Sequence, residues 1–160
     1  RQPTVVDDNE PSGAIWVHPE NGAKGPFGVA SNAIASAGNG THHKRPWACL
    51  DIAKEDFPLF AAIDFNLCYS HSGDNTWDVD VPTSPSPLEA WRKFAPGFGL
   101  RSVADNPLYS AADGSPRRFC LCAQSAASPM VAAGSRALSS PTDAAGRTRS
   151  GQPDIGACQF

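Results

Sequence analysis

The densest polar cluster of the chain occupies residues 41–47 (T-H-H-K-R-P-W). His43 is a candidate general base, and Lys44 and Arg45 are cations that could stabilise a developing negative charge. These three side chains are therefore the candidate catalytic residues. The structural alternative, which we favour, is a solvated loop between two strands.

A second candidate site lies in residues 77–80 (W-D-V-D). Side chains alternate along a strand, so Asp78 and Asp80 would share one face. Paired carboxylates can hydrolyse glycosidic bonds. The alternative that we favour is a polar rim beside a loop.

Exposed tryptophans could act as platforms on which sugar rings stack. Trp16, Trp47 and Trp77 are candidates, although the sequence does not show which of them are exposed. The predicted substrate-binding residues are Trp47, Trp77, Asp78 and Asp80.

Residues 7–10 (D-D-N-E) supply oxygen ligands of the kind that calcium prefers, but without the spacing of a known calcium motif. The alternative that we favour is a flexible terminus. His42 and His43 precede Cys49, yet adjacent histidines point apart on a strand. We therefore predict no cofactor, with calcium as a weak alternative.

The five cysteines are an odd number, so at least one of them has no partner within the chain. Their spacings do not match a zinc site. Buried strand cysteines, or one or two disulfides, are the favoured interpretation. The cysteines are Cys49, Cys68, Cys120, Cys122 and Cys158.

Composition excludes several classes of protein. The chain has 160 residues and a net charge of −3, and its lysines and arginines are scattered, which argues against a nucleic-acid partner. No apolar run approaches the roughly 20 residues of a membrane-spanning helix. Its length indicates a single domain. The chain begins at Arg1 without a signal-like segment, which indicates a processed chain or a fragment.

Short apolar runs separated by turn residues dominate the sequence, and this pattern predicts an all-β fold. The exception is residues 87–94, which we predict to be helical. Ser86 could be the N-cap, with Pro87 in the first turn and Glu89 completing a capping box. We expect Trp91 to be buried, because one face of this helix carries Leu88, Trp91 and Ala95. Residues 82–87 (P-T-S-P-S-P) read as a surface loop that leads into the helix.

Six segments from residue 63 onward resemble, in order, the carboxyl-terminal region of right-handed parallel β-helix proteins of the pectate-lyase-like family. They are residues 63–70 (I-D-F-N-L-C-Y-S), 88–91 (L-E-A-W), 102–109 (S-V-A-D-N-P-L-Y), 119–121 (F-C-L), 128–134 (S-P-M-V-A-A-G) and 154–160 (D-I-G-A-C-Q-F). The resemblance implies an all-β, right-handed parallel β-helix end with one short helix. Near residues 29–34 it also implies an inward Asn32 that could join a ladder of stacked asparagines. A lone turn asparagine is the alternative.

Each coil of such a fold buries its inward side chains only by stacking on neighbouring coils. The expected inward residues are Val29, Ile34, Leu50, Ile52, Ile63, Phe65 and Leu67. The matched motifs belong to the end of the fold, so we expect another polypeptide to supply the preceding coils. Its strands would pair in parallel with strands between Ala14 and Ala53.

The family also implies a function and a location, namely a secreted or surface protein that binds or degrades polysaccharide. If the protein is an enzyme, it would be a polysaccharide lyase or glycoside hydrolase, with His43, Lys44 and Arg45 acting on a uronate unit. The alternative is a structural or adhesive surface protein whose β-helix is a rigid shaft.

The same family pattern brings Cys158 near Cys120 or Cys122, and we expect a disulfide there. Cys49 and Cys68 lie about one coil apart and form a second candidate pair. Both expectations suit an extracellular protein.

Overall fold

The structure is a computed structural model that describes residues 13–17, 24–36, 48–70, 76–78, 81, 87–108 and 126–159. These residues form short strands, one 3₁₀ helix (η1) and one α-helix, followed by an irregular carboxyl-terminal segment. The expected all-β class with a short helix is confirmed, and η1 is an addition to the sequence prediction. In chain order the elements are β1 (Gly13–Val17), β2 (Phe27–Ala30), β3 (Ala33–Ser36), β4 (Ala48–Ile52), η1 (Lys54–Leu59), β5 (Phe60–Asp64), β6 (Leu67–Ser70), β7 (Thr76–Asp78) and α1 (Leu88–Phe94).

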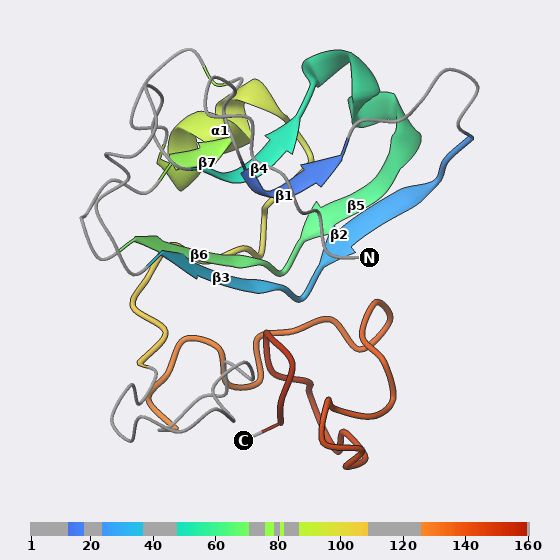
Figure 1. Ribbon diagram of the computed structural model, residues 1–160, viewed down its shortest axis with the longest axis vertical. Helices are drawn as coiled ribbons and strands as arrows, with labels where there is room; N and C mark the ends of the chain where they lie inside the picture. Colours follow the sequence, from blue (N-terminus) through green and yellow to red (C-terminus); the bar gives the residue numbers. More distant parts are fainter. Residues whose placement is uncertain are drawn as a thin grey trace.

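Strands β1 to β4 each pair in parallel with the strand three places later in the chain (Figure 1). β1, β4 and β7 form one sheet, β2 and β5 a second, and β3 and β6 a third. In this register Ile15 lies opposite Leu50, and Ile34 lies opposite Cys68. Two parallel strands that lie side by side must be joined by a long connection. Here each connection contains the strands of the other two sheets. The chain therefore visits three sheets in turn and then returns to the first.

The bends between the second and third sheets are built in the same way. Ser31 follows β2 and Phe65 follows β5, with φ angles of 59° and 56°. This left-handed conformation is uncommon for residues other than glycine. An asparagine comes next in both bends, Asn32 in one and Asn66 in the other. Each bend interrupts the extended chain, so the first bend separates β2 from β3 and the second separates β5 from β6.

The two asparagines stack, as the ladder hypothesis predicts, although they are 34 positions apart. The Asn32 backbone N–H and side-chain amide donate to Asn66 Oδ1 at 3.1 and 3.0 Å. Asn66 Nδ2 donates to the Val29 carbonyl at 2.9 Å, and the Asn66 backbone N–H donates to Ser102 Oγ at 3.1 Å. Ser102 thus extends this chain of hydrogen bonds beyond Asn66. These side chains satisfy backbone groups that the strand ladders leave unpaired at the bends.

Most of the residues expected to face inward are buried. Val29, Ile34, Leu50, Ile52, Ile63 and Leu67 are at most 8% exposed. The expectation for Phe65 is wrong, because this residue occupies a bend rather than a strand. Its ring is only partly buried and is covered by the Arg101 guanidinium, 4.2 Å from the ring centroid.

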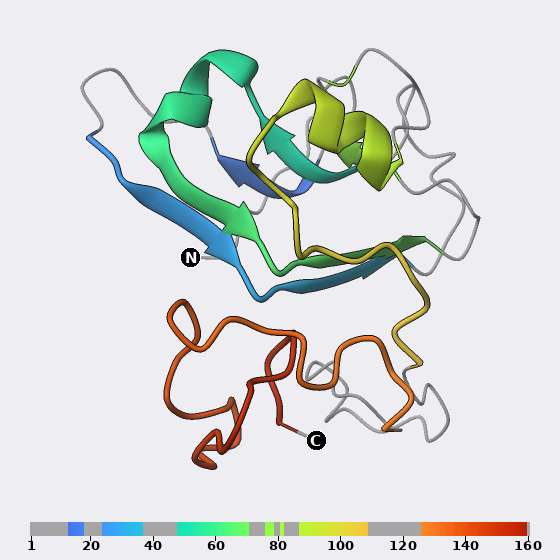
Figure 2. The ribbon, with the colours of Figure 1, turned by 180° about the vertical axis from the view of Figure 1, so that it is seen from behind.

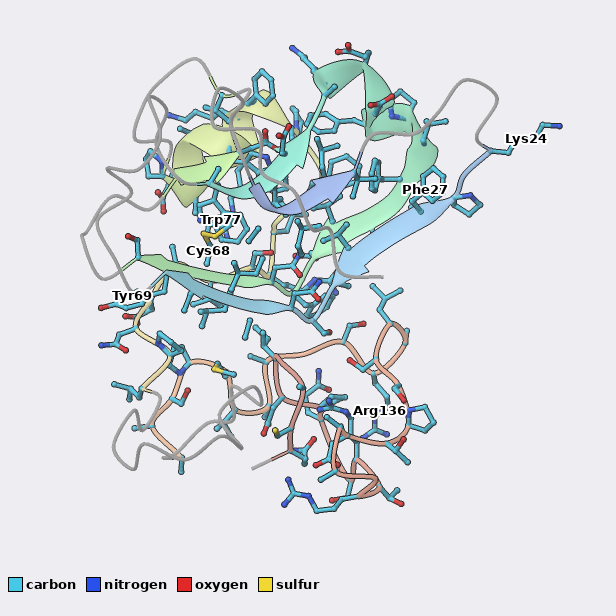
Figure 3. The ribbon with its side chains drawn as sticks, viewed as in Figure 1. Lys24, Phe27, Cys68, Tyr69, Trp77 and Arg136 are labelled. Carbon is cyan, nitrogen blue, oxygen red and sulfur yellow. A yellow bond between two sulfur atoms is a disulfide. The ribbon has the colours of Figure 1, made fainter. Side chains whose placement is uncertain are left out.

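A disulfide joins Cys49 of β4 to Cys68 of β6, as the sequence suggested (Figure 3). Both side chains are fully buried, and their Cα atoms lie 6.0 Å apart. The bridge therefore links the first sheet to the third through the core. Cys158 is also buried and disulfide-bonded, and its partner lies outside the described residues, as Cys120 and Cys122 both do.

Helix α1 lies beside β7 (Figure 2). Trp91 is fully buried, as expected, and its ring centroid lies 5.7 Å from that of Trp77. The predicted start of the helix is wrong by one residue, because the N-cap is Pro87, whose ψ of 164° is extended, and no side chain caps the helix. Gly99 packs against the helix so closely that a Cβ atom there would overlap the Trp91 ring.

Residues 126–159, here called the closing segment, lie next to β3 and β6 in both views (Figure 1, Figure 2). Met130 and Ile155 are fully buried against Leu67 of β6. Ser31 anchors the segment, because its carbonyl accepts from Gly156 N–H at 2.8 Å and its Oγ accepts from Ser135 N–H at 3.1 Å. The bend at Ser31 and Asn32 thus makes hydrogen bonds both to the neighbouring bend and to the closing segment.

We predict that Asn66→Ala destabilises the protein by about 3 kcal/mol, because the Asn32 donors and the Val29 carbonyl would lose a buried partner. Urea unfolding followed by circular dichroism measures the loss. The control is Asn106→Ala, an exposed asparagine in a loop, which should cost less than about 1 kcal/mol. Equal effects of the two substitutions would contradict a structural role for the stack.

Candidate functional site

Several site residues predicted from the sequence lie outside the described residues. They are residues 7–10, His42, His43, Lys44, Arg45, Trp47 and Asp80. The side chain of Trp16 is not described either. The predictions made for these residues stay predictions.

Trp77 and Asp78 are described, and their surroundings do not suit the predicted sugar contact. Trp77 is fully buried against Trp91, so the interpretation of its ring as a surface platform is wrong. Asp78 is only 1% exposed and cannot form an open polar rim. The physical reason is that β7 is covered by α1, which docks through Trp91 (Figure 2).

Within the described part of the chain, no three His, Cys, Asp or Glu side chains gather in a way that could hold a metal ion. The same residues include no helix that is long and apolar enough to cross a membrane.

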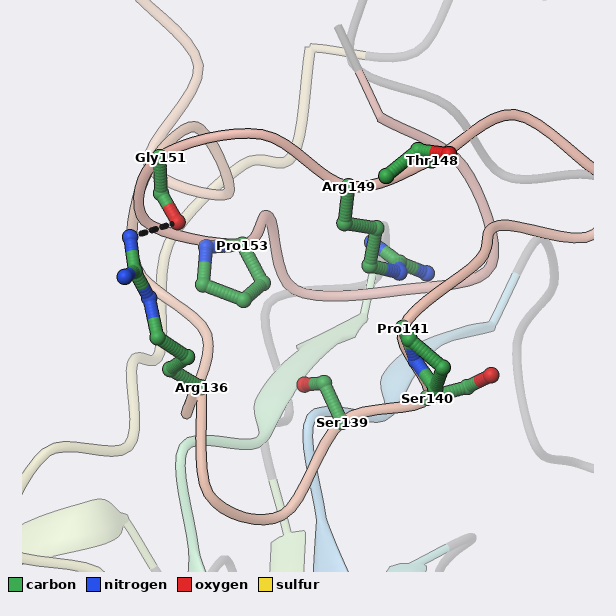
Figure 4. A pocket seen from close by; sticks show the side chains of 8 residues that line it. All are labelled: Arg136, Ser139, Ser140, Pro141, Thr148, Arg149, Gly151 and Pro153. Carbon is green, nitrogen blue, oxygen red and sulfur yellow. Dashed lines mark hydrogen bonds between the residues drawn. The ribbon is translucent and has the colours of Figure 1, made fainter.

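The closing segment carries a cavity of about 290 Å³ (Figure 4). Three hydroxyl side chains, two guanidinium groups and two proline rings contribute to its wall. The lining residues are Arg136, Ser139, Ser140, Pro141, Thr148, Arg149, Gly151 and Pro153.

A tight loop forms one wall of this cavity. Thr142 and Thr148 meet in an antiparallel bridge, and the Arg149 N–H donates to the Pro141 carbonyl at 2.9 Å. Short polar residues, proline and glycine favour such a turn. The opposite wall is fixed to the sheets, because Ser139 Oγ lies 3.0 Å from Ser31 Oγ.

Asp143 holds the loop together from inside. Its carboxylate accepts hydrogen bonds from the N–H groups of Ala145 and Arg147 at 2.9 and 2.8 Å, and from Arg147 Nε at 2.8 Å. Burial by itself would raise the pKa of Asp143. The hydrogen bonds from the backbone and guanidinium of Arg147, with those from Gln159 and Ala145, outweigh burial and lower the pKa to about 2.

The two arginines of the cavity bond to main-chain carbonyls. Arg149 Nη2 donates to the Gly156 carbonyl at 2.9 Å, and Arg149 Nη1 lies 3.5 Å from the Cys158 carbonyl. Arg136 Nη2 donates to the Gly151 carbonyl. The site can therefore offer positive charge and hydroxyl groups to a polar ligand, and none of the described residues that line it carries a carboxylate.

Sequence reasoning missed this cavity, because its residues fall between two matched motifs, 128–134 and 154–160, and show no periodicity. The available signal was a local excess of arginine, with Arg136, Arg147 and Arg149 in a short polar stretch.

Comparisons with protein-family models, with curated proteins and with solved structures gave no match to this chain.

We predict that Asp143→Asn destabilises the protein in a pH-dependent way. The pKa of Asp143 in the folded protein, about 2, lies below the ordinary aspartate value of 3.8, so the carboxylate contributes stability above about pH 4 and this contribution is lost as the pH falls towards 2. The difference in melting temperature between wild type and variant should be largest near neutral pH and should shrink between pH 4 and pH 2. Thermal melts across this range measure it. For the exposed Asp105→Asn control, the difference should be small throughout, whereas a pH-independent effect of Asp143→Asn would contradict the assignment.

Proposed function

We propose that the described strands are the last coils of a right-handed parallel β-helix, closed by residues 126–159. The pairing of each strand with the one three places later supports this proposal, as does the stack of Asn32 on Asn66. Parallel crossover connections are nearly always right-handed, which supports the handedness. The resemblance of residues 63–160 to pectate-lyase-like proteins is an argument by analogy and points the same way.

We further propose that the protein binds polysaccharide through the cavity of the closing segment and does so without catalysis. The observation that carries this proposal is the lining of the cavity, in which hydroxyl and guanidinium groups lie beside proline rings and, among the described lining residues, no carboxylate is present. Hydroxyl and guanidinium groups supply the hydrogen bonds that sugar hydroxyls need, and proline rings offer apolar surface.

An extracellular location suits this function. The Cys49–Cys68 disulfide and the disulfide-bonded Cys158 are the supporting observations. Disulfides persist mainly in oxidising compartments, such as the exterior of the cell.

We predict that Ser140→Trp abolishes binding to polysaccharide, because an indole ring at this exposed position in the lining would fill the cavity. Affinity electrophoresis against a panel of neutral and acidic polysaccharides measures binding. Ala104→Trp places the same ring in an exposed loop that does not line the cavity, and it should leave binding unchanged. Binding that survives Ser140→Trp would exclude the cavity as the site.

A second candidate function is a structural or adhesive shaft assembled with another chain. The supporting observation is that, among the described strands, β1, β2 and β3 each pair on one side only. Their other edges offer backbone donors and acceptors to further parallel strands.

On this second hypothesis, residues 1–160 expressed alone should aggregate or fold poorly, because open strand edges and apolar residues would lack neighbours. Sedimentation velocity and thermal melting test it. A soluble monomer with one sharp cooperative transition would contradict the need for a partner chain.

A further inference from the structure

We infer that Ser31 is a positioning residue of the cavity, because it holds the hydroxyl group of Ser139 in place for a bound sugar. In this arrangement Ser139 Oγ accepts a hydrogen bond from a sugar hydroxyl. The inference rests on the proposed polysaccharide binding, and it adds the residue that makes the contact and the residue that orients it. Ser31 lies in the bend between β2 and β3 and is not itself one of the lining residues.

The lining of the cavity comes from two stretches of the closing segment, residues 136–141 and 148–153 (Figure 4). Both stretches are attached to Ser31. Ser135, which precedes the first stretch, donates its N–H to Ser31 Oγ at 3.1 Å. Gly156, which follows the second stretch, donates its N–H to the Ser31 carbonyl at 2.8 Å. One residue of the bend therefore determines where both walls of the cavity lie.

Ser139 is the lining residue whose hydroxyl group Ser31 orients. Ser139 Oγ donates to Ser31 Oγ at 3.0 Å. A serine hydroxyl has one hydrogen to donate and two lone pairs that accept, so Ser139 keeps lone pairs for a donor in the cavity. Ser140 and Thr148, the other hydroxyl residues of the lining, are exposed, whereas Ser139 is partly buried. The Ser139 hydroxyl is therefore oriented before a ligand arrives, which lowers the entropy cost of binding.

The backbone conformation at Ser31 favours glycine, yet a serine occupies this position. Its φ angle of 59° lies in the left-handed region, which residues with a Cβ atom seldom adopt. The hydroxyl group of this serine accepts hydrogen bonds from both Ser135 and Ser139. Phe65 occupies the equivalent place in the second bend, and its ring, which has no hydrogen-bonding group, lies under Arg101. The first bend thus uses its left-handed residue to hold the wall of the cavity.

The first test is Ser31→Gly, because glycine adopts the left-handed conformation without strain while the hydroxyl group is lost. The melting temperature should therefore change by less than about 4 °C. Affinity electrophoresis in gels that contain galactan, dextran or polygalacturonate measures binding. We expect Ser31→Gly to weaken binding of the polysaccharide that retards the wild-type protein by about tenfold, because Ser139 loses its fixed direction.

The matched control is Ala132→Gly. Ala132 is also left-handed, with a φ angle of 51°, and it is an exposed residue of the closing segment that does not line the cavity. This substitution places the same residue in the same backbone conformation without removing a hydroxyl group. It should change the affinity less than twofold.

A double-mutant cycle separates positioning from a general loss of structure. Ser139→Ala should also weaken binding by about tenfold, since it removes the acceptor itself. If Ser31 acts through Ser139, the double variant should bind about as weakly as Ser139→Ala alone. A loss of about a hundredfold in the double variant would mean that the two effects are independent, and it would contradict the positioning role.

Amide hydrogen exchange, followed by NMR without polysaccharide, tests the wall of the cavity directly. In Ser31→Gly the Ser135 amide loses its acceptor and should exchange at least about tenfold faster. The Gly156 amide should keep its protection, because it donates to a main-chain carbonyl that the substitution retains. Equal loss of protection at both amides would mean that the closing segment undocks as a whole and that Ser31 is only a structural anchor.

The outcomes separate this inference from the proposed function. If a polysaccharide binds and Ser140→Trp abolishes binding, but Ser31→Gly and Ser139→Ala bind normally, the inference is wrong and polysaccharide binding stands. If no polysaccharide binds, but Ser31→Gly exposes the Ser135 amide and not the Gly156 amide, Ser31 positions the wall and polysaccharide binding is wrong. If no polysaccharide binds and the Ser135 amide is unaffected, both are wrong.

Discussion

The buried side-chain amide of Asn66 is the contact on which the arrangement of the sheets depends. At each bend the chain leaves one sheet and enters the next, so backbone groups there lose their strand partners while remaining inside the protein. Asn66 accepts from Asn32 and donates to the Val29 carbonyl, and its own N–H is satisfied by Ser102. The two bends are therefore aligned, which is consistent with the parallel register of β2 with β5 and of β3 with β6.

The position of the closing segment follows from the same bend. The left-handed conformation of Ser31 turns the chain, and both its carbonyl and its Oγ are used by residues of the closing segment. Ser139, a cavity residue, is among those that contact it. The geometry of the cavity is therefore fixed to the sheets through one serine, although none of its lining residues belongs to a strand.

The sequence allowed the all-β class, the helix and most core residues to be predicted, because short apolar runs, turn residues and helical spacing are local signals. The burial of Trp91 was predicted correctly, since its place on the apolar face of a short helix depends only on neighbouring residues. The prediction for Phe65 was wrong because this residue occupies a left-handed bend and not a strand, and that for Trp77 was wrong because its burial depends on Trp91 of the later helix. The cavity could not be predicted, since its walls meet only after a tight turn and the docking at Ser31 have brought unpatterned residues together.

The docking at Ser31 also has a consequence for the order of folding. Neighbouring strand turns join residues about one repeat apart, such as Asn32 and Asn66 with a separation of 34, whereas Ser31 contacts Ser135 and Ser139 across separations of 104 and 108. Closing a longer loop costs more chain entropy before any contact forms. The strand turns should therefore assemble progressively and locally, and the closing segment should dock last. The contacts of Ser31 with the closing segment should therefore form late in folding, after the sheets that position this serine have assembled.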